Sequence, residues 1–348
     1  MLFSSVIGVN IYCCVLTYIC AAVKGGIAEQ VSAATAVDVC VPPSVALPFG
    51  AFDRALGAAE NAPASEMLDV AIEALGAASC DRAATNAALA AARAAIERLA
   101  LPAGLVDEVR AAAEAASAYG IAAACDVAAE PSWWPEVRRV WASKWNERAH
   151  ASRAAMGVAD ADLHMAVLLM ELVPAEYAFV LHSRNPVAET PAPGEMLGEV
   201  VVGLGETLVG NHPGAPLCFT ATAPAGAPAA SNIGIRSLPS KLDAMRVVAS
   251  DGGFSPLICR SDSNGEDLEG FAGAGLYDSF STAGGVATSA VDYGGEQLLW
   301  DGGFQGALCD KLARFASALE AAMGGPQDVE GAVVGDTVYL LQARPQQV

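Results

Sequence analysis

The sequence predicts an α+β protein, with a mainly helical part followed by a part rich in strands. Two observations lead to this prediction. Residues 63–120 are dense in alanine and place apolar residues at helical spacing, whereas after residue 160 short continuous apolar runs alternate with turn residues. Such runs are typical of buried strands. We therefore expect an apolar N-terminal segment at 1–41, a mainly helical lobe at 42–160 and a mixed sheet lobe at 161–348.

Four helices are expected in the helical lobe. Ser65 suits the N-cap of the first and Asp81 that of the second, because their side-chain oxygens can accept hydrogen bonds from free N–H groups of the first turn. The second helix should end near Pro102, where the ring cannot continue it. A third helix is expected from Leu105 to Gly120, and a fourth after Pro135.

Strands are expected where a continuous apolar run is bounded by glycine, proline or charged residues. In chain order the runs are 165–170, 177–181, 200–202, 217–222 and 257–259. A loop rich in proline and glycine follows the fourth run at 224–228. The character of the chain therefore changes from helix to strand after residue 160.

Charge and cysteine content exclude several classes of function. The formal net charge of −20 argues against nucleic acid or an anionic membrane as the main partner, since both favour a basic surface. ATP remains possible, because its binding needs only local positive charge, and so does a neutral polysaccharide. The nine cysteines are scattered without a CxxC pair, which indicates reduced thiols rather than a zinc site or a disulfide framework.

Residues 1–23 carry no charge and are largely apolar, and their number suits a membrane span. The segment lacks the positive start of a secretory signal and the arginines of a chloroplast transit peptide. Three interpretations stay open at this point: a hydrophobic anchor or signal, a buried strand or helix, and an incorrect translation start.

The segment from Arg260 to Ser279 has the pattern of a strand that ends in a phosphate-binding turn. It follows the apolar run 256–259 and contains Gly270, Gly273 and Gly275. Glycines allow main-chain N–H groups to approach phosphate oxygens closely, and an arginine adds a fixed positive fork. On pattern alone, an ordinary surface loop fits this segment as well.

A β-hairpin is expected at the C-terminus, around a turn at 335–337. If the loop has an odd number of residues centred on Asp336, Glu330 lies opposite Gln342 and Asp328 lies opposite Arg344. These four residues should then share one face, together with the side chains of Ala332, Val334, Val338 and Leu340. A carboxylate beside an amide oxygen suits Mg²⁺, although an exposed pair of polar residues is the simpler alternative.

Together these motifs resemble one known family. In order and spacing, most of the chain after about residue 42 is similar to the C-terminal nucleotide-binding domain of plant and algal alpha-glucan water dikinases, whose wider relatives are pyruvate phosphate dikinase and phosphoenolpyruvate synthase. The matching stretches are 44–50, 141–149, 203–210, 260–279, 326–331 and 341–345. The resemblance implies an ATP-grasp-type, two-lobed nucleotide-binding domain with an alanine-rich helical insertion.

The resemblance also implies roles for particular residues. Arg260, Arg344 and Asp328 would act on the phosphates of ATP, and Glu330 and Gln342 would hold Mg²⁺. Glu171 lies where such proteins pass the adenine, and Glu206 follows a turn that borders the cleft, although a strand end and a tight turn explain them equally well. The implied nucleotide-binding set is Arg148, Lys144, Glu171, Glu206, Arg260, Gly270, Gly273, Gly275 and Arg344.

By the same resemblance, the domain would pass phosphate from Mg-ATP towards a phosphohistidine and then to glucosyl units of starch, in the chloroplast. None of the four histidines, at 150, 164, 182 and 212, matches the family's phosphohistidine motif. A phosphohistidine domain would therefore lie elsewhere in a longer protein or act in trans, and alpha-glucan would be an indirect partner.

Two alternatives remain. A non-catalytic or truncated nucleotide-binding module would explain the missing histidine motif and the missing lysine-containing element that the family has upstream of residue 44. A pyruvate or phosphoenolpyruvate dikinase is the other, but residues 141–148 and 263–270 resemble glucan dikinases more closely.

Overall fold

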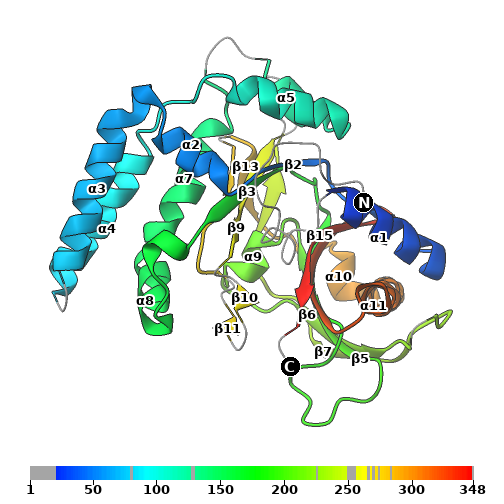
Figure 1. Cartoon of the computed structure of the whole chain (residues 1–348). Coiled ribbons are helices and arrows are strands. Elements are labelled where there is room, and N and C mark those ends of the chain that lie inside the picture. Colours follow the sequence, from blue (N-terminus) through cyan, green and yellow to red (C-terminus); the bar gives the residue numbers. More distant parts are fainter. Residues whose placement is uncertain are drawn as a thin grey trace. The chain divides into compact units, whose positions relative to one another are not determined.

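The computed structural model describes residues 21–346, apart from 79–80, 127–129, 225, 249–255, 265–266, 269–270, 273–274 and 283 (Figure 1). The described residues form two compact units. The first contains residues 43–171 and those described between 256 and 282, and the second contains 21–42, 172–248 and 284–346. Nearly all of the apolar segment 1–23 lies outside the described residues. Among the described residues, no helix is both long and apolar enough to cross a membrane.

A four-stranded sheet forms the centre of the first unit, in the order β12-β9-β3-β2. Every neighbouring pair in it is antiparallel. Its strands are β2 (Ser44–Leu47), β3 (Met165–Glu171), β9 (Leu257–Ser263) and β12 (Phe280–Ser281), and a small hairpin joins β10 (Asp267–Leu268) to β11 (Phe271–Ala272). The division of the chain therefore differs from the one expected at residue 160, because β3 and β9 pair with β2 within this unit.

The helices of this unit share an apolar core with one face of the sheet. They are α2 (Gly50–Leu56), α3 (Ala62–Ala77), α4 (Arg82–Ile96), α5 (Leu105–Ala115), α6 (Tyr119–Ala124), α7 (Trp134–Ala142) and α8 (Glu147–Met156), with 3-10 turns η1 (Ala59–Asn61), η2 (Ser143–Trp145) and η3 (Asp160–Asp162). The predicted cap at Asp81 is confirmed, since its side chain accepts from the N–H groups of Ala83 and Ala84. The cap predicted at Ser65 is wrong: α3 starts three residues earlier, where Pro63 is tolerated because first-turn N–H groups lack helical partners.

The third expected helix is also divided. It begins at Leu105 as predicted but ends at Ala115, and α6 then runs through Gly120.

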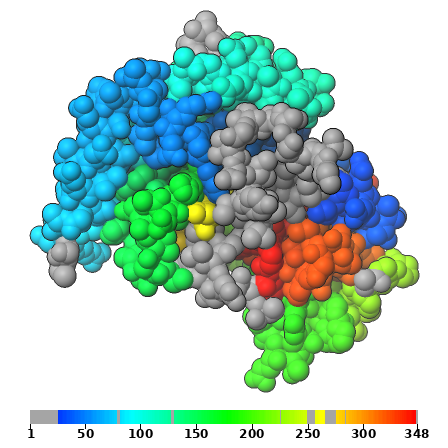
Figure 2. All heavy atoms as spheres, viewed as in Figure 1, coloured from blue at the N-terminus to red at the C-terminus, as the bar shows by residue number. Residues whose placement is uncertain are grey.

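The core beneath these helices is aromatic, with four tryptophans at most 2% exposed: Trp133, Trp134, Trp141 and Trp145. The surface that α3 and α4 form in this unit is visible in Figure 2 (light blue).

The second unit is built on a seven-stranded sheet in the order β1-β15-β14-β4-β5-β6-β7. The strands are β1 (Val39–Cys40), β4 (Tyr177–His182), β5 (Glu195–Val202), β6 (Leu217–Thr222), β7 (Ser231–Ser237), β14 (Gln327–Val334) and β15 (Thr337–Pro345). The pair β1–β15 is parallel and the others are antiparallel. A separate ribbon pairs β8 (Asp243–Val247) with β13 (Val286–Ala290).

One face of the seven-stranded sheet is covered by helices. Side chains of α1 (Ala21–Thr35) and α11 (Gly302–Met323) share a core with inward residues of the strands, and the short helices α9 (Glu206–Val209) and α10 (Gln297–Trp300) complete the unit. Phe315 of α11 packs edge-on against Phe179 of β4, with ring centroids 5.9 Å apart. The mixed α+β class predicted from the sequence is thus confirmed.

The C-terminal hairpin reaches the predicted pairing by a different route. Asp328 lies opposite Arg344, and Glu330 lies opposite Gln342, as expected. The turn, however, has only two residues, with positive φ at Gly335, and a bulge at Leu341 then shifts the register back.

The observed faces of the C-terminal hairpin differ from the predicted ones. The face of β14 that carries Val329 and Val333 also carries Val338 and Leu340 of β15, which lie between the turn and the bulge. All four side chains belong to the apolar core. The prediction that Val338 and Leu340 share the polar face is wrong, because the two-residue turn places Val338 opposite Val333. Only after the bulge at Leu341 do Gln342 and Arg344 share the face of Glu330 and Asp328.

Gly331 beside this bulge has no room for a side chain. An added Cβ would lie 2.1 Å from the ring Cζ of Phe179 and 2.7 Å from the carbonyl oxygen of Tyr339. We expect Gly331→Ala to lower the free energy of unfolding by about 1–3 kcal/mol, since an overpacked core must shift its neighbours. Urea unfolding followed by far-UV circular dichroism measures this change.

The matched control is Gly306→Ala in α11, where an added Cβ would meet no atom within 4 Å. This change should be neutral or stabilise by up to about 1 kcal/mol, because alanine favours helices over glycine. Equal effects of the two substitutions would contradict the packing assigned to Gly331.

Candidate functional site

The face of the seven-stranded sheet opposite α11 carries most of the predicted site residues of the second unit. We define the polar face by six side chains from β5, β4, β14 and β15. They are Glu199, His182, Asp328, Glu330, Gln342 and Arg344, and cross-strand register places them on the same side of the sheet. The opposite side belongs to the apolar core.

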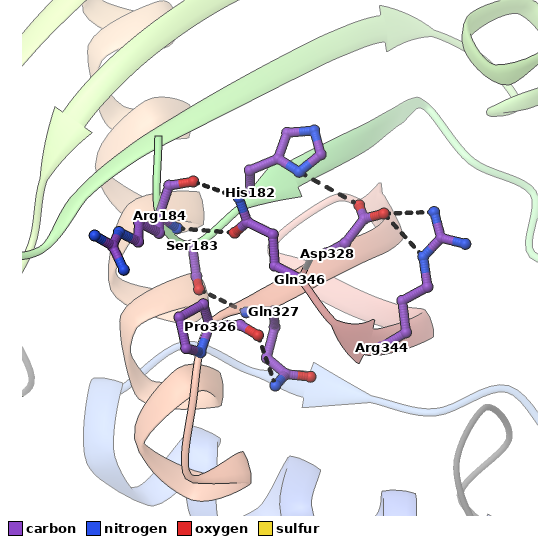
Figure 3. A network of polar contacts seen from close by, with 8 residues as sticks. All are labelled: His182, Ser183, Arg184, Pro326, Gln327, Asp328, Arg344 and Gln346. Atoms are coloured by element: carbon purple, nitrogen blue, oxygen red, sulfur yellow. Dashed lines mark hydrogen bonds and ion pairs between the residues drawn. The ribbon is translucent and has the colours of Figure 1, made fainter. Parts of the chain in front are cut away.

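One row of the polar face joins His182, Asp328 and Arg344 on three adjacent strands (Figure 3). The Asp328 Oδ2 atom accepts from Arg344 Nε at 2.9 Å and from Arg344 Nη2 at 2.6 Å. The His182 Nδ1 atom lies 3.7 Å from the other oxygen, Oδ1. Their side chains are 15–29% exposed, so the carboxylate is held between a guanidinium and an imidazole in a half-buried setting.

The next row contains Glu330 and Gln342, which are direct cross-strand neighbours, followed by Val180 and Glu199 on β4 and β5. A carboxylate and an amide carbonyl are hard oxygen donors, and Mg²⁺ usually takes one or two protein ligands and completes its shell with water and phosphate oxygens. This donor pair fits that requirement. Among the described residues, no group of three or more histidine, cysteine, aspartate or glutamate side chains could hold a metal by itself.

A second polar network fixes the end of these strands, and nothing in the sequence marks it (Figure 3). Gln327 N–H donates to Ser183 Oγ at 2.8 Å, and Ser183 N–H donates to Gln327 O at 2.9 Å. The Gln346 side chain donates to Arg184 O at 2.7 Å and accepts from Arg184 N–H at 3.2 Å. These bonds lock β4 to β14 and to the end of β15, directly beside Asp328 and Arg344.

The remaining site residue of this unit, Glu206, starts the short helix α9. The turn before it is tied to the β8 strand, because Leu204 N–H donates to Met245 O at 2.8 Å. The predicted strand-to-helix turn is therefore present, whereas the nucleotide contact of Glu206 stays a prediction.

In the first unit, Arg260 lies on β9 opposite Leu168 of β3, and its side chain is half-buried. Gly275 has φ of +73°, a conformation that glycine adopts readily. Gly270 and Gly273 lie outside the described residues. The phosphate-binding roles of Arg260 and the three glycines therefore stay predictions.

Arg148 holds the end of the glycine-rich segment. It forms an ion pair with Asp278, and its Nε donates to Leu276 O at 3.0 Å. The preceding Asn146 donates to the same Asp278 carboxylate at 2.6 Å, and Asp278 N–H donates to Ser143 Oγ at 3.2 Å. The motif around Arg148 thus has a structural function, which the sequence did not indicate.

Lys144 is buried and also makes structural contacts. Its Nζ donates to the carbonyl oxygens of Asp160 and Leu163 at 2.7 and 2.8 Å, and it lies 4.8 Å from the ring centroid of Trp145. Burial lowers the pKa of the Lys144 ammonium to about 8. Two of its three donors are directed at backbone of its own unit, so a phosphate contact is not needed to explain this lysine.

Glu171 lies at the end of β3, as expected, but its carboxylate is engaged. Its Oε1 accepts from Gly120 N–H in the first turn of α6 at 2.8 Å, and its own N–H donates to Pro43 O at 3.0 Å. The side chain therefore stabilises a helix N-terminus, where negative charge is favoured. A role for this segment beside adenine stays a prediction.

Comparison with known proteins confirms the resemblance predicted from the motifs. Residues 124–214 match the AMP/ATP-binding domain of pyruvate phosphate dikinase. The chain is 37% identical over 311 residues to a chloroplastic alpha-glucan water dikinase of Solanum tuberosum, and 37% identical over 309 residues to one of Citrus reticulata. It is 36% identical over 311 residues to the chloroplastic alpha-glucan water dikinase 1 of Arabidopsis thaliana.

Each of these alignments covers 88% of the chain but only 19–21% of the relative. The chain thus spans about a fifth of the length of the curated relatives it matches.

The buried ammonium of Lys144 should make stability depend on pH. The pKa of this ammonium is lower in the folded state than the usual 10.5. Between pH 8 and 10.5 the unfolded chain therefore binds more protons than the folded chain does. The stability that Lys144 contributes accordingly rises with pH across that window. We expect the penalty of Lys144→Met, relative to wild type, to grow by roughly 2 kcal/mol from pH 7.5 to 9.5.

Urea unfolding followed by tryptophan fluorescence suits this test, because four of the five tryptophans are buried in the first unit. The same penalty at both pH values would contradict the lowered pKa of the buried Lys144 ammonium.

Proposed function

We propose that this protein is the ATP-binding kinase domain of a glucan water dikinase. Residues 124–214 match an ATP-binding domain of the pyruvate phosphate dikinase type, and the chain resembles alpha-glucan water dikinases. It binds Mg-ATP in an ATP-grasp-type fold and passes phosphate towards a phosphohistidine, and from there to glucosyl units of an alpha-glucan. The names of two matched relatives from different plants support a chloroplast location.

The observation that supports this proposal most is the arrangement of the polar face. Arg344 and the pair of Glu330 and Gln342 occupy adjacent rows of one rigid hairpin. An anionic phosphate needs positive charge, and Arg344 supplies a planar fork whose orientation is set by Asp328. A bound Mg²⁺ would be held by Glu330 and Gln342 and would neutralise charge on the phosphates.

Such a site needs little covalent chemistry from the protein. Phosphoryl transfer depends mainly on the position of the donor and acceptor and on compensation of the developing charge. Arg344 orients the phosphates, Asp328 fixes Arg344, and the network of Ser183, Gln327 and Gln346 keeps the strands in register. The roles proposed for Arg260, Arg148, Lys144, Glu171, Glu206 and the glycines rest on the family resemblance alone.

The histidine that receives the phosphate is proposed to belong to another domain, either in a longer protein or in trans. The four histidines of this chain lack the family's acceptor motif, and the chain spans only a fifth of its curated relatives. The missing motif equally favours the second candidate, a nucleotide-binding module without catalysis. Transfer of labelled phosphate to an added histidine domain separates the two candidates.

The role of Glu330 predicts metal-dependent loss of binding. We expect Glu330→Gln to weaken ATP binding at least about tenfold in Mg²⁺ but to leave binding in EDTA unchanged, since the carboxylate acts through the ion. Isothermal titration calorimetry with ATP in both conditions provides the measurement. Glu199→Gln, on the same face but away from Gln342, is the matched control and should bind ATP as wild type does.

An equal loss in Mg²⁺ and EDTA would assign Glu330 to fold stability. If wild type itself does not bind Mg-ATP, or if the double variant Arg260→Ala and Glu330→Ala binds it unchanged, the proposed function is wrong.

The chain alone should not phosphorylate glucan. Transfer requires donor and acceptor in near-attack geometry, and the acceptor histidine is proposed to lie on another domain. With β-labelled ATP and starch, we expect no labelled glucan from this chain by itself. A separately expressed histidine domain should become labelled weakly, because untethered partners lose effective concentration. Labelled starch from the isolated chain would contradict this and make one of its own histidines the carrier.

A further inference from the structure

Asp278, near the end of the glycine-rich segment, collects contacts from one short stretch of the first unit. Its carboxylate accepts from Asn146 Nδ2 at 2.6 Å and forms an ion pair with Arg148. Its N–H donates to Ser143 Oγ at 3.2 Å. Arg148 Nε donates in addition to Leu276 O at 3.0 Å. These contacts, which we call the Asp278 clamp, join two stretches of chain that lie more than a hundred residues apart.

The other end of the glycine-rich segment is held as well. Asn264 directly follows β9, and its side chain makes two hydrogen bonds to the backbone. Its Nδ2 donates to Asp162 O at 2.9 Å, and its Oδ1 accepts from His164 N–H at 2.9 Å. The antiparallel pair of β10 and β11 and the turn at Gly275 lie between Asn264 and Asp278 in the chain. Both ends of the segment are therefore fixed within the first unit.

The Asp278 clamp contributes more to the position of this segment than to the stability of the unit. The side chains of Arg148 and Asp278 are 53% and 34% exposed. Ion pairs as exposed as this one add little to the free energy of folding, because water and salt screen the charges. The planar guanidinium nevertheless sets a direction, since its donors are arranged in a rigid fork.

The clamp also occupies the positive charge of Arg148. Its Nε is directed at Leu276 O, and its Nη2 is paired with Asp278 Oδ1. A phosphate bound directly by Arg148 would have to compete with the Asp278 carboxylate, so removal of that carboxylate would strengthen phosphate binding. If Arg148 acts by holding the segment, the same removal weakens phosphate binding. The two roles therefore predict opposite effects of one substitution.

We propose that Asp278 is a positioning residue for the phosphates of ATP, and that Arg148 and Asn146 act through it. The clamp holds the glycine-rich segment in the conformation that binds phosphate, without contact between Asp278 and the nucleotide. This inference rests on the proposed function, in which that segment binds the phosphates. A segment that is ordered before the ligand arrives loses less conformational freedom on binding, so the clamp raises affinity.

Isothermal titration calorimetry of the whole chain with Mg-ATP and with adenosine tests this role. Asp278→Ala should weaken Mg-ATP binding about tenfold and change adenosine binding less than about twofold, because only ATP carries the phosphates that the held segment binds. Asp278→Asn should fall between wild type and Asp278→Ala, since its amide oxygen still accepts from Arg148 but its charge is lost. A variant that fails to fold loses both ligands, so adenosine is the internal control for folding.

A double-mutant cycle shows whether Arg148 and Asp278 act as one unit. Arg148→Ala and the double variant of Arg148→Ala with Asp278→Ala should both weaken Mg-ATP binding by the same factor as Asp278→Ala, because each removes the same clamp. The matched control is Glu108→Ala, which breaks an ion pair of the first unit with Arg54 at 2.9 Å. The side chains of that pair are 47% and 45% exposed, and the variant should bind Mg-ATP as wild type does.

Several results would overturn the inference while the proposed function stands. One is wild-type binding of Mg-ATP that Asp278→Ala leaves unchanged or strengthens, and strengthening would give Arg148 a direct phosphate contact. Another is an equal loss of Mg-ATP and adenosine, which would limit Asp278 to maintaining the fold. Additive losses in the double variant would separate Arg148 from the clamp. If wild type itself does not bind Mg-ATP, both proposals are wrong.

Discussion

The pairing of β14 with β15 is the constraint on which the candidate site depends. A two-residue turn followed by a bulge at Leu341 sets two successive pairs, Glu330 with Gln342 and Asp328 with Arg344, in adjacent rows. Without the bulge, each residue of β15 beyond it would be displaced by one position, and side chains of a displaced strand change faces. The Ser183 and Gln346 contacts then hold this register at the end of the strands.

How much of the fold and of the candidate site could be predicted depends on how far apart in the sequence the contacting residues lie. The Asp81 cap was predictable because a cap involves neighbours in sequence. The hairpin pairs were predicted from an odd-numbered turn, and they occur because the two-residue turn and the bulge at Leu341 offset one another. The bulge itself was not predictable, since Leu341 is one apolar residue among several and carries no local signal. The partners of Arg148 and Glu171 lie far away in the sequence, at Asp278 and Gly120, and only the fold reveals them.

These long-range contacts change how the family-like motif around Lys144 and Arg148 is understood. Lys144 and Arg148 belong to a segment that resembles a family motif, yet their observed contacts are with backbone carbonyls and with Asp278. The observed contacts of these two residues therefore shape their own unit and need no nucleotide to explain them. The second unit differs, because Asp328 and Arg344 lie on the sheet face away from its apolar core. These two side chains already orient one another by a hydrogen bond, so they can bind a ligand on that face without rearrangement.

The central claim is that Glu330 and Gln342 hold the metal of bound ATP, and a crystal grown with Mn²⁺ and a non-hydrolysable ATP analogue tests it most directly. The measurement is the position of the manganese peak in an anomalous difference map. Our account predicts one peak within ligand distance of the side-chain oxygens of both residues, about 2.1 Å as for Mg²⁺, with the phosphates towards Arg344. A nucleotide-bound metal peak away from this pair would contradict the account.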